Sequence, residues 1–323
     1  MFYIVSRGST ATHWVAKNLS KHQDIVCFFA SRSFPPLEPG KAYPSNKETW
    51  VQEPLDASKY LDSLIMCENA THGSKVFGSI HGYHNLEMKN LVEQKGGIFR
   101  YMVRHPLEQV HSAFIYYCNK LFKKNSKNIP NQDIHNYICD KLKNFKINKN
   151  HFIKKTHNPH FLRKYMSEEK FLQIKRFKNF MISNLRNLTS KKGFLERLSS
   201  VSEENQIVNI FSRMALDFLF TQNLYFQNWG ENNALKMEKI FSDKNYFKLI
   251  INILSPNSKV DDSFIETIYS SNKERVNIHR EKPINNDQIF RELPNCLKEI
   301  FDFHFQNNQM KKYCDHFKYK IDF

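Results

Sequence analysis

Short apolar runs alternate with stretches of helical spacing over the first third of the chain. Each run is short enough to be a buried strand, and each ends in a turn or in apolar positions three or four residues apart. One further short run follows near residue 235. The strand candidates are Phe2–Val5, Ile25–Phe29, Lys75–His81, Ile98–Val103 and Ala234–Lys236. Because strands that alternate with helices build βαβ units, the pattern predicts an α/β fold with a central parallel sheet flanked by helices.

Helical spacing accounts for most of the remaining chain. The segments with this spacing are Leu86–Gln94, a stretch from Pro106 past Tyr117, residues 119–228, Asp243–Leu254 and a tail around Ile289–Gln306. We find no internal repeat, no low-complexity segment and no Gly/Ser linker. The pattern therefore predicts a single domain over residues 1–323, with a basic helical insertion at about 119–205.

The formal net charge of +16 is distributed unevenly along the chain. Segment 119–197 holds 20 Lys and Arg against five Asp and Glu, a net charge of +15, so the other residues together are close to neutral. Such a segment either attracts an anionic partner or forms a well-solvated helical surface. Its phenylalanines recur near helical spacing, which fits an apolar core better than the exposed aromatic and basic pattern of nucleic-acid readers. We therefore expect no nucleic-acid partner.

Composition narrows the class of protein further. No apolar run approaches the roughly 20 residues of a membrane-spanning helix. Phe2–Val5 leads directly into a glycine turn and lacks the basic and longer apolar regions of a secretion signal, which predicts a cytoplasmic protein. The six cysteines include no CxxC pair and the 14 histidines lack paired-ligand spacing, so we expect reduced thiols and no metal site.

A turn rich in small residues follows the first strand candidate. It runs from Ser6 to Thr12, in the sequence Ser-Arg-Gly-Ser-Thr-Ala-Thr, and helical spacing begins at Trp14. In a strand–turn–helix element of this kind, backbone N–H groups and the helix N-terminus converge on an anion. The turn does not end in Gly-Lys-Ser/Thr, which disfavours a kinase or an NTPase. By itself, the turn also fits an ordinary connection capped by Ser and Thr.

A second motif follows the fourth strand candidate. Arg104 lies at the strand end, Pro106 suits the first turn of the next helix, and Ser112 comes eight residues after the arginine. Eight residues are about two helical turns, so the serine lies on the same side of the helix, further along. A guanidinium group and a hydroxyl placed in this way can hold one phosphate from two directions.

Together, the two motifs resemble those of the PAPS-dependent sulfotransferase family, whose donor is 3′-phosphoadenosine-5′-phosphosulfate. Members carry a 5′-phosphosulfate loop such as RSGTT or PKSGTTW after the first strand. A later R-x-P, with a serine eight residues after its arginine, binds the 3′-phosphate. The resemblance implies a three-layer P-loop-type fold. It assigns the 5′-phosphosulfate to Arg7, Gly8, Ser9, Thr10, Ala11, Thr12, His13 and Trp14, and the 3′-phosphate to Arg104 and Ser112.

The resemblance also indicates catalytic residues. His81 ends the third strand candidate, where many members of the family place the general base, and an imidazole can accept a proton at neutral pH. His84, His13 and Glu238 are alternatives for this role. Arg7 is expected to stabilise the charge that develops on the leaving phosphate.

Two weaker similarities lie toward the C-terminus. Ala234–Phe241 resembles a strand-to-helix element of the family, with Met237 in place of the usual aromatic residue. Residues 272–280 resemble a basic loop that closes over the nucleotide in some members. The cofactor contacts expected in that loop are Lys273, Arg275 and Arg280.

The resemblance implies transfer of a sulfuryl group from PAPS to an acceptor hydroxyl or amine of a carbohydrate, lipid or small molecule. The product nucleotide would be 3′,5′-ADP (PAP), and no metal is required. The basic segment favours an anionic glycan or lipid as acceptor and leaves contact with a membrane surface open. Two alternatives remain: a non-catalytic anion-binding module that uses segment 119–197, and another nucleotide-dependent transferase.

Overall fold

The computed structural model describes residues 1–7, 11–29, 57–80, 86–130, 132–147, 201–270 and 286–321. The chain divides into two compact units. The first comprises Met1–Arg104 and Asn228–Asn277, and the second comprises His105–Gln227 and Ile278–Phe323. The expectation of a single domain over 1–323 stays a prediction.

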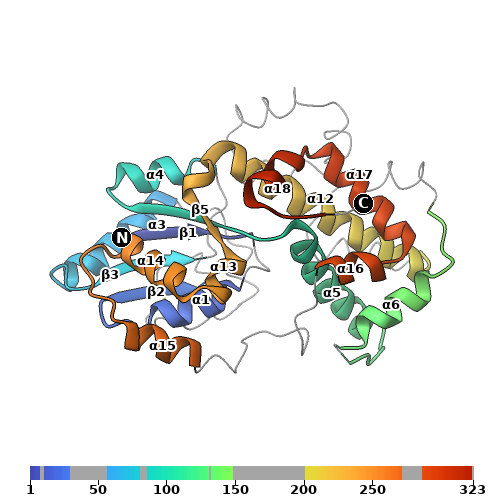
Figure 1. The fold of residues 1–323 in the computed structure, drawn as a ribbon, viewed down its shortest axis with the longest axis horizontal. Helices are drawn as coiled ribbons and strands as arrows, with labels where there is room; N and C mark the ends of the chain where they lie inside the picture. The colour runs from blue at the N-terminus through green and yellow to red at the C-terminus, as the bar shows by residue number, and fades with distance from the viewer. Residues whose placement is uncertain are drawn as a thin grey trace. The chain divides into compact units, whose positions relative to one another are not determined.

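A parallel sheet forms the centre of the first unit (Figure 1). Its strands are β1 (Phe2–Val5), β2 (Ile25–Phe29), β3 (Val76–Ile80), β4 (Ile98–Val103) and β5 (Ala234–Lys236). Their order across the sheet is β2-β3-β1-β4-β5, and every neighbouring pair is parallel. The strands agree with the five sequence candidates to within one residue, so the α/β class and the parallel sheet are confirmed.

Helices cover both faces of this sheet (Figure 1). One face packs against α1 (Thr12–Leu19), α13 (Met237–Ser242), α14 (Lys244–Leu254) and α15 (Asp262–Ser270). The other packs against α3 (Ala57–Ala70) and α4 (Met88–Gln94). A short 3₁₀ turn, η1 (Glu231–Asn233), precedes β5. The first unit therefore has three layers.

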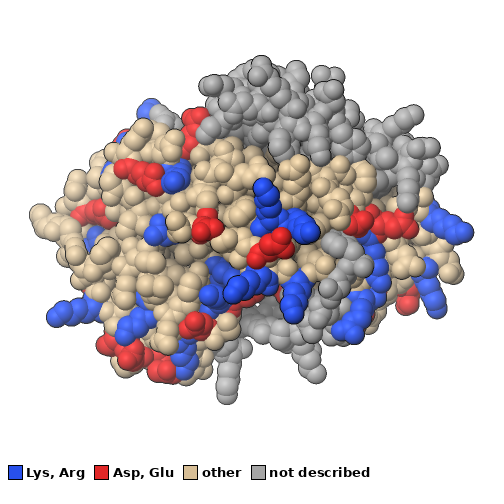
Figure 2. All heavy atoms as spheres, turned by 45° about the horizontal axis from the view of Figure 1, so that its top comes forward, with Lys and Arg blue, Asp and Glu red and all other residues tan. Residues whose placement is uncertain are grey.

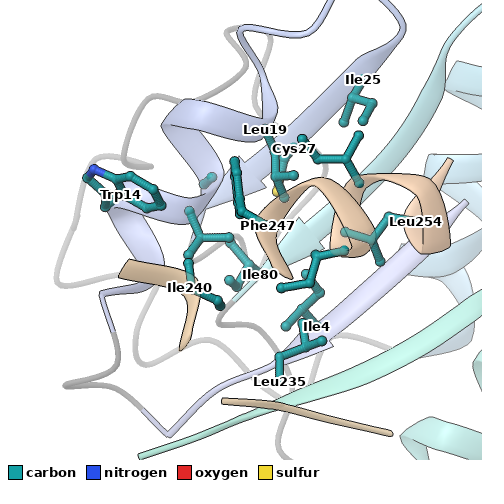
Figure 3. Packing of buried hydrophobic residues seen from close by; sticks show 14 of the residues in the cluster. Ile4, Trp14, Leu19, Ile25, Cys27, Ile80, Leu235, Ile240, Phe247 and Leu254 are labelled. Atoms are coloured by element: carbon teal, nitrogen blue, oxygen red, sulfur yellow. The ribbon is translucent and has the colours of Figure 1, made fainter. Parts of the chain in front are cut away.

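Alternation along β1 explains how both faces are filled. Phe2 and Ile4 belong to the apolar cluster shared with α1 and α14, whereas Tyr3 meets Tyr60 of α3 edge-to-face at 6.1 Å. Figure 3 shows Ile4 in the same cluster as residues of α1 and α14, such as Leu19 and Phe247. Gly78 of β3 is required by the close packing, because a Cβ atom there would lie 2.2 Å from the ring of Phe2.

The second unit is helical over its described residues. It contains α5 (Pro106–Lys124), α6 (Ile134–Leu142), most of α12 (Glu203–Trp229), α16 (Asn286–Glu292), α17 (Asn295–Asn307) and α18 (Lys311–Phe317). Phe114 of α5 meets Phe211 of α12 edge-to-face, with 5.0 Å between ring centroids.

Over the described ranges, no helix is long and apolar enough to cross a lipid bilayer.

The C-terminal tail differs from the single helix around Ile289–Gln306 that its spacing predicts. The structure has two helices there, α16 and α17, separated at Leu293 and Pro294. Proline disfavours the helical conformation in the residue before it and lacks a backbone N–H. Pro294 instead takes the N-cap position of α17, where a missing N–H costs nothing.

Only part of the expected basic insertion lies within the described ranges. Residues 119–130 and 132–147 are described and include α6, whereas residues 148–200 lie outside them. Figure 2 shows Lys and Arg side chains interspersed with Asp and Glu on the described surface of one face. The charge excess of segment 119–197 is therefore a property of the sequence, and its role stays a prediction.

Candidate functional site

The carboxyl ends of β1 and β4 form the candidate site. From β1 the chain passes through α1 to β2 on one side of the sheet, whereas from β4 it returns to the sheet as β5 on the other side. Connections thus leave these two neighbouring strands in opposite directions. In open α/β sheets, ligands bind beyond the carboxyl ends of the strands at such a switch point.

Strand register brings three basic residues to this edge. Val5 of β1 pairs with Tyr101 of β4, so continuing the register sets Arg7 level with Val103, and Arg104 is the next residue. On the far side of β4, Val103 pairs with Lys236 of β5. All three basic side chains are half-buried. Since neighbouring strands are about 4.8 Å apart, this edge concentrates positive charge and suits an anionic ligand.

Lys236 is a residue whose role the sequence alone did not suggest. It ends β5, and its backbone N–H donates to the hydroxyl of Tyr246 at 3.0 Å. Burial is the main reason that the pKa of Tyr246 is raised. The hydroxyl therefore stays protonated, and its contact ties the end of β5 to α14. The only sequence signal was the position of Lys236 at the end of a strand-like run.

The start of α1 has an unusual backbone conformation. Ala11, its N-cap residue, has φ 54° and ψ 29°, in the left-handed region, and offers no capping side chain. The first turn of α1 contains no acidic residue. The positive end of this helix is thus not neutralised from within its own first turn, and backbone N–H groups there can bind an anion. Gly8, Ser9 and Thr10 precede it and lie outside the described residues.

Ala11→Gly is expected to stabilise the chain. An L-residue in the left-handed region costs about 1–2 kcal/mol, and glycine avoids this at the expense of about 0.5–1 kcal/mol of chain entropy. We expect a net gain of about 0.5–1 kcal/mol in the free energy of unfolding, measured by urea denaturation. Ala16→Gly, in the buried middle of the same helix, should instead lower stability by about 1 kcal/mol or more. Destabilisation by Ala11→Gly would show that the left-handed conformation carries no strain.

The side chains of α1 separate into core and edge positions. Trp14 packs in the apolar cluster, 4.8 Å from Phe241 and 5.5 Å from Phe247 between ring centroids, so its indole belongs to the core. Thr12 is buried at the first position of the helix. His13 lies 5.1 Å from Phe29, again between ring centroids.

His13 is kept neutral by its surroundings. Burial, and secondarily the nearby charge of Lys17, lower the pKa of its imidazole below the usual value. Its Nδ1 atom is buried without a hydrogen-bond partner among the described residues. A neutral imidazole can accept a proton, so His13 stays an alternative to His81 as a base.

Several expected site residues lie outside the described residues, namely His81, His84, Lys273, Arg275 and Arg280. β3 ends at Ile80, the residue before His81, and Ile80 pairs with Ile4 of β1. The chain therefore leaves β3 toward His81 at the same edge as Arg7.

Ser112 and Glu238 lie on helices of different units. Ser112 is half-buried on α5 of the second unit, so its pairing with Arg104 stays a prediction. Glu238 is half-buried in the first turn of α13, two residues after Lys236.

No group of three or more His, Cys, Asp or Glu side chains within the described ranges is arranged to hold a metal ion.

Comparison of the chain with protein-family models, with curated proteins and with solved structures finds no match.

Proposed function

We propose that the chain is a PAPS-dependent sulfotransferase that uses a P-loop-type fold. The observation that carries the proposal is the edge of the sheet where Arg7 and Arg104 follow neighbouring strands, beside the N-terminus of α1. PAPS has two separate anionic groups, the 5′-phosphosulfate and the 3′-phosphate. The turn before α1 suits the first, and Arg104 suits the second, assisted by Ser112.

The proposed reaction is an in-line displacement on sulfur. The acceptor oxygen or nitrogen forms a bond to sulfur while the bond between sulfur and the bridging oxygen of the nucleotide breaks. His81 takes the proton that the acceptor loses, and 3′,5′-ADP departs. By analogy with phosphoryl transfer, positioning and electrostatic stabilisation supply most of the catalysis.

Arg7 and the N-terminus of α1 act on the leaving group. Negative charge grows on the bridging oxygen as the bond to sulfur breaks, and cationic or N–H groups held in advance at that point lower the barrier. Arg7 comes two residues after β1, on the same strand–turn–helix element as the backbone N–H groups of α1. Lys236 adds positive charge at the same edge.

Incubation with PAPS and a panel of glycan, lipid, phenol and amine acceptors tests the proposed activity. We expect one acceptor class to gain the mass of SO₃ while an equal amount of 3′,5′-ADP forms. Adenosine 5′-phosphosulfate, which lacks the 3′-phosphate, is the matched donor control and should be used poorly. Transfer of a phosphoryl group from ATP, without any sulfuryl transfer, would instead indicate another nucleotide-dependent transferase.

A further inference from the structure

A thiol and an imidazole lie in contact in the second unit, and the proposed sulfuryl transfer does not use them. His135 and Cys139 are four residues apart on α6, so both lie on one face of the helix. The sulfur of Cys139 lies 3.6 Å from Nε2 of His135. Cys139 is partly exposed, whereas His135 is only 8% exposed.

The imidazole of His135 is held from its other nitrogen as well. Nδ1 of His135 lies 3.1 Å from Nε2 of His111 on α5, and His111 is 2% exposed. A base whose ring is fixed from the opposite nitrogen, with its other nitrogen near a nucleophile, is the arrangement that activates thiols. Cys139 is therefore placed as the nucleophile, His135 as its base and His111 as the group that orients the base.

Glu292 of α16 contacts the same pair. Its Oε2 lies 3.2 Å from Nε2 of His135, and its backbone carbonyl accepts a hydrogen bond from the thiol of Cys139 at 3.4 Å. The carboxylate stabilises a positively charged imidazole, so it favours the state in which the proton has moved from sulfur to His135.

We propose that Cys139 is a reactive thiol that forms mixed disulfides with small disulfide compounds, with His135 as its base. His135 takes the thiol proton through Nε2, and the sulfur of Cys139 attacks one sulfur of the disulfide. A new S–S bond forms as the old one breaks. The departing thiolate takes the proton back from His135, so one thiol and one disulfide give one mixed disulfide and one small thiol.

The other five cysteines lack this activation. Burial raises the pKa of Cys296 to about 11 and that of Cys314 to about 12, and it also raises the pKa values of Cys27 and Cys118. The pKa of Cys67 is raised by burial and by the carboxylate of Glu68. Because Cys67 is also partly exposed, it is a matched internal control for Cys139.

The test is the reaction of the full chain with the neutral disulfide 4,4′-dithiodipyridine, followed at each cysteine by peptide mass spectrometry. A thiol beside a protonated imidazole can have its pKa lowered by one or more units, so Cys139 should react roughly tenfold faster than Cys67 at pH 7. Between pH 6 and 8 the rate at Cys67 should rise throughout with the thiolate fraction, whereas the rate at Cys139 should rise less steeply and level off toward pH 8. Parallel pH profiles at similar rates would overturn the proposal.

The His135→Asn variant shows whether Cys139 reacts quickly because His135 activates it or only because it is exposed to solvent. The variant should slow Cys139 to the rate of Cys67, whereas His316→Asn on α18 should leave the rate unchanged. Cys118 is fully buried, so its protection reports whether each variant is folded. A folded His135→Asn variant with unchanged Cys139 reactivity would contradict the role of His135. If that variant unfolds, the pH dependence of the rates at Cys139 and Cys67 in the unaltered chain tests the proposal.

Discussion

Arg104→Ala is expected to remove most of the binding of 3′,5′-ADP. Arg104 directly follows β4 and is the residue assigned to the 3′-phosphate. A hydrogen bond to a charged group contributes about 1.5–3 kcal/mol, so losing even one such bond between the guanidinium group and the phosphate should lower the affinity roughly 100-fold. At about 100 times the original dissociation constant, the nucleotide would stabilise the unaltered chain by about 2.7 kcal/mol but the variant by about 0.4 kcal/mol. Thermal denaturation with and without nucleotide measures this difference.

Lys95→Ala is the control for Arg104→Ala, because it also removes one positive charge but lies away from the candidate site. Lys95 lies between α4 and β4, at the amino edge of the sheet, and forms an exposed 2.5 Å ion pair with Asp62. Exposed pairs of this kind contribute little to stability, so the control should keep the full nucleotide response. An equal loss in both variants would mean that net charge, and not a site at Arg104, binds the nucleotide.

His81→Ala is expected to lower turnover by roughly 10²–10⁴-fold, the usual contribution of a positioned general base. The binding of 3′,5′-ADP should hardly change, because His81 is assigned to the acceptor. Steady-state rates with saturating PAPS, together with nucleotide melting shifts, measure the two effects separately.

A second histidine near β3 provides the control for His81. His72 is exposed in the turn before β3, at the opposite end of that strand, and has a φ of 50°. His72→Asn keeps a residue that tolerates this conformation and should leave turnover unchanged. Full activity of His81→Ala would transfer the role of base to His84, His13 or Glu238.

The strands of the sheet could be predicted from the sequence because they are short, apolar and bounded by turns. Ile25–Phe29 and Ile98–Val103 were placed without error. The helix α3 was not foreseen, since it follows a proline-rich stretch and buries little more than Tyr60, Leu61, Ser63 and Leu64. Apolar spacing that continues through Pro294 predicts one helix in the tail, whereas the structure ends the first helix at Glu292, shortly before this proline.

The sequence predicts the basic residues of the candidate site but not how the fold brings them together. Arg7 and Arg104 were identified from motifs, yet only strand order shows that they follow neighbouring strands. Lys236 joins them through the pairing of β5 with β4, which involves residues more than 100 positions apart. The left-handed conformation of Ala11 was equally hidden, because alanine ordinarily favours the interior of a helix.

Calorimetric titration of the unaltered chain with 3′,5′-ADP and with 5′-AMP tests the central claim most directly. The two nucleotides differ only in the 3′-phosphate, which Arg104 is proposed to bind. The account predicts that 3′,5′-ADP binds roughly 100-fold more tightly, a difference of about 2.7 kcal/mol. Equal affinities for the two nucleotides, or no binding of either, would contradict it.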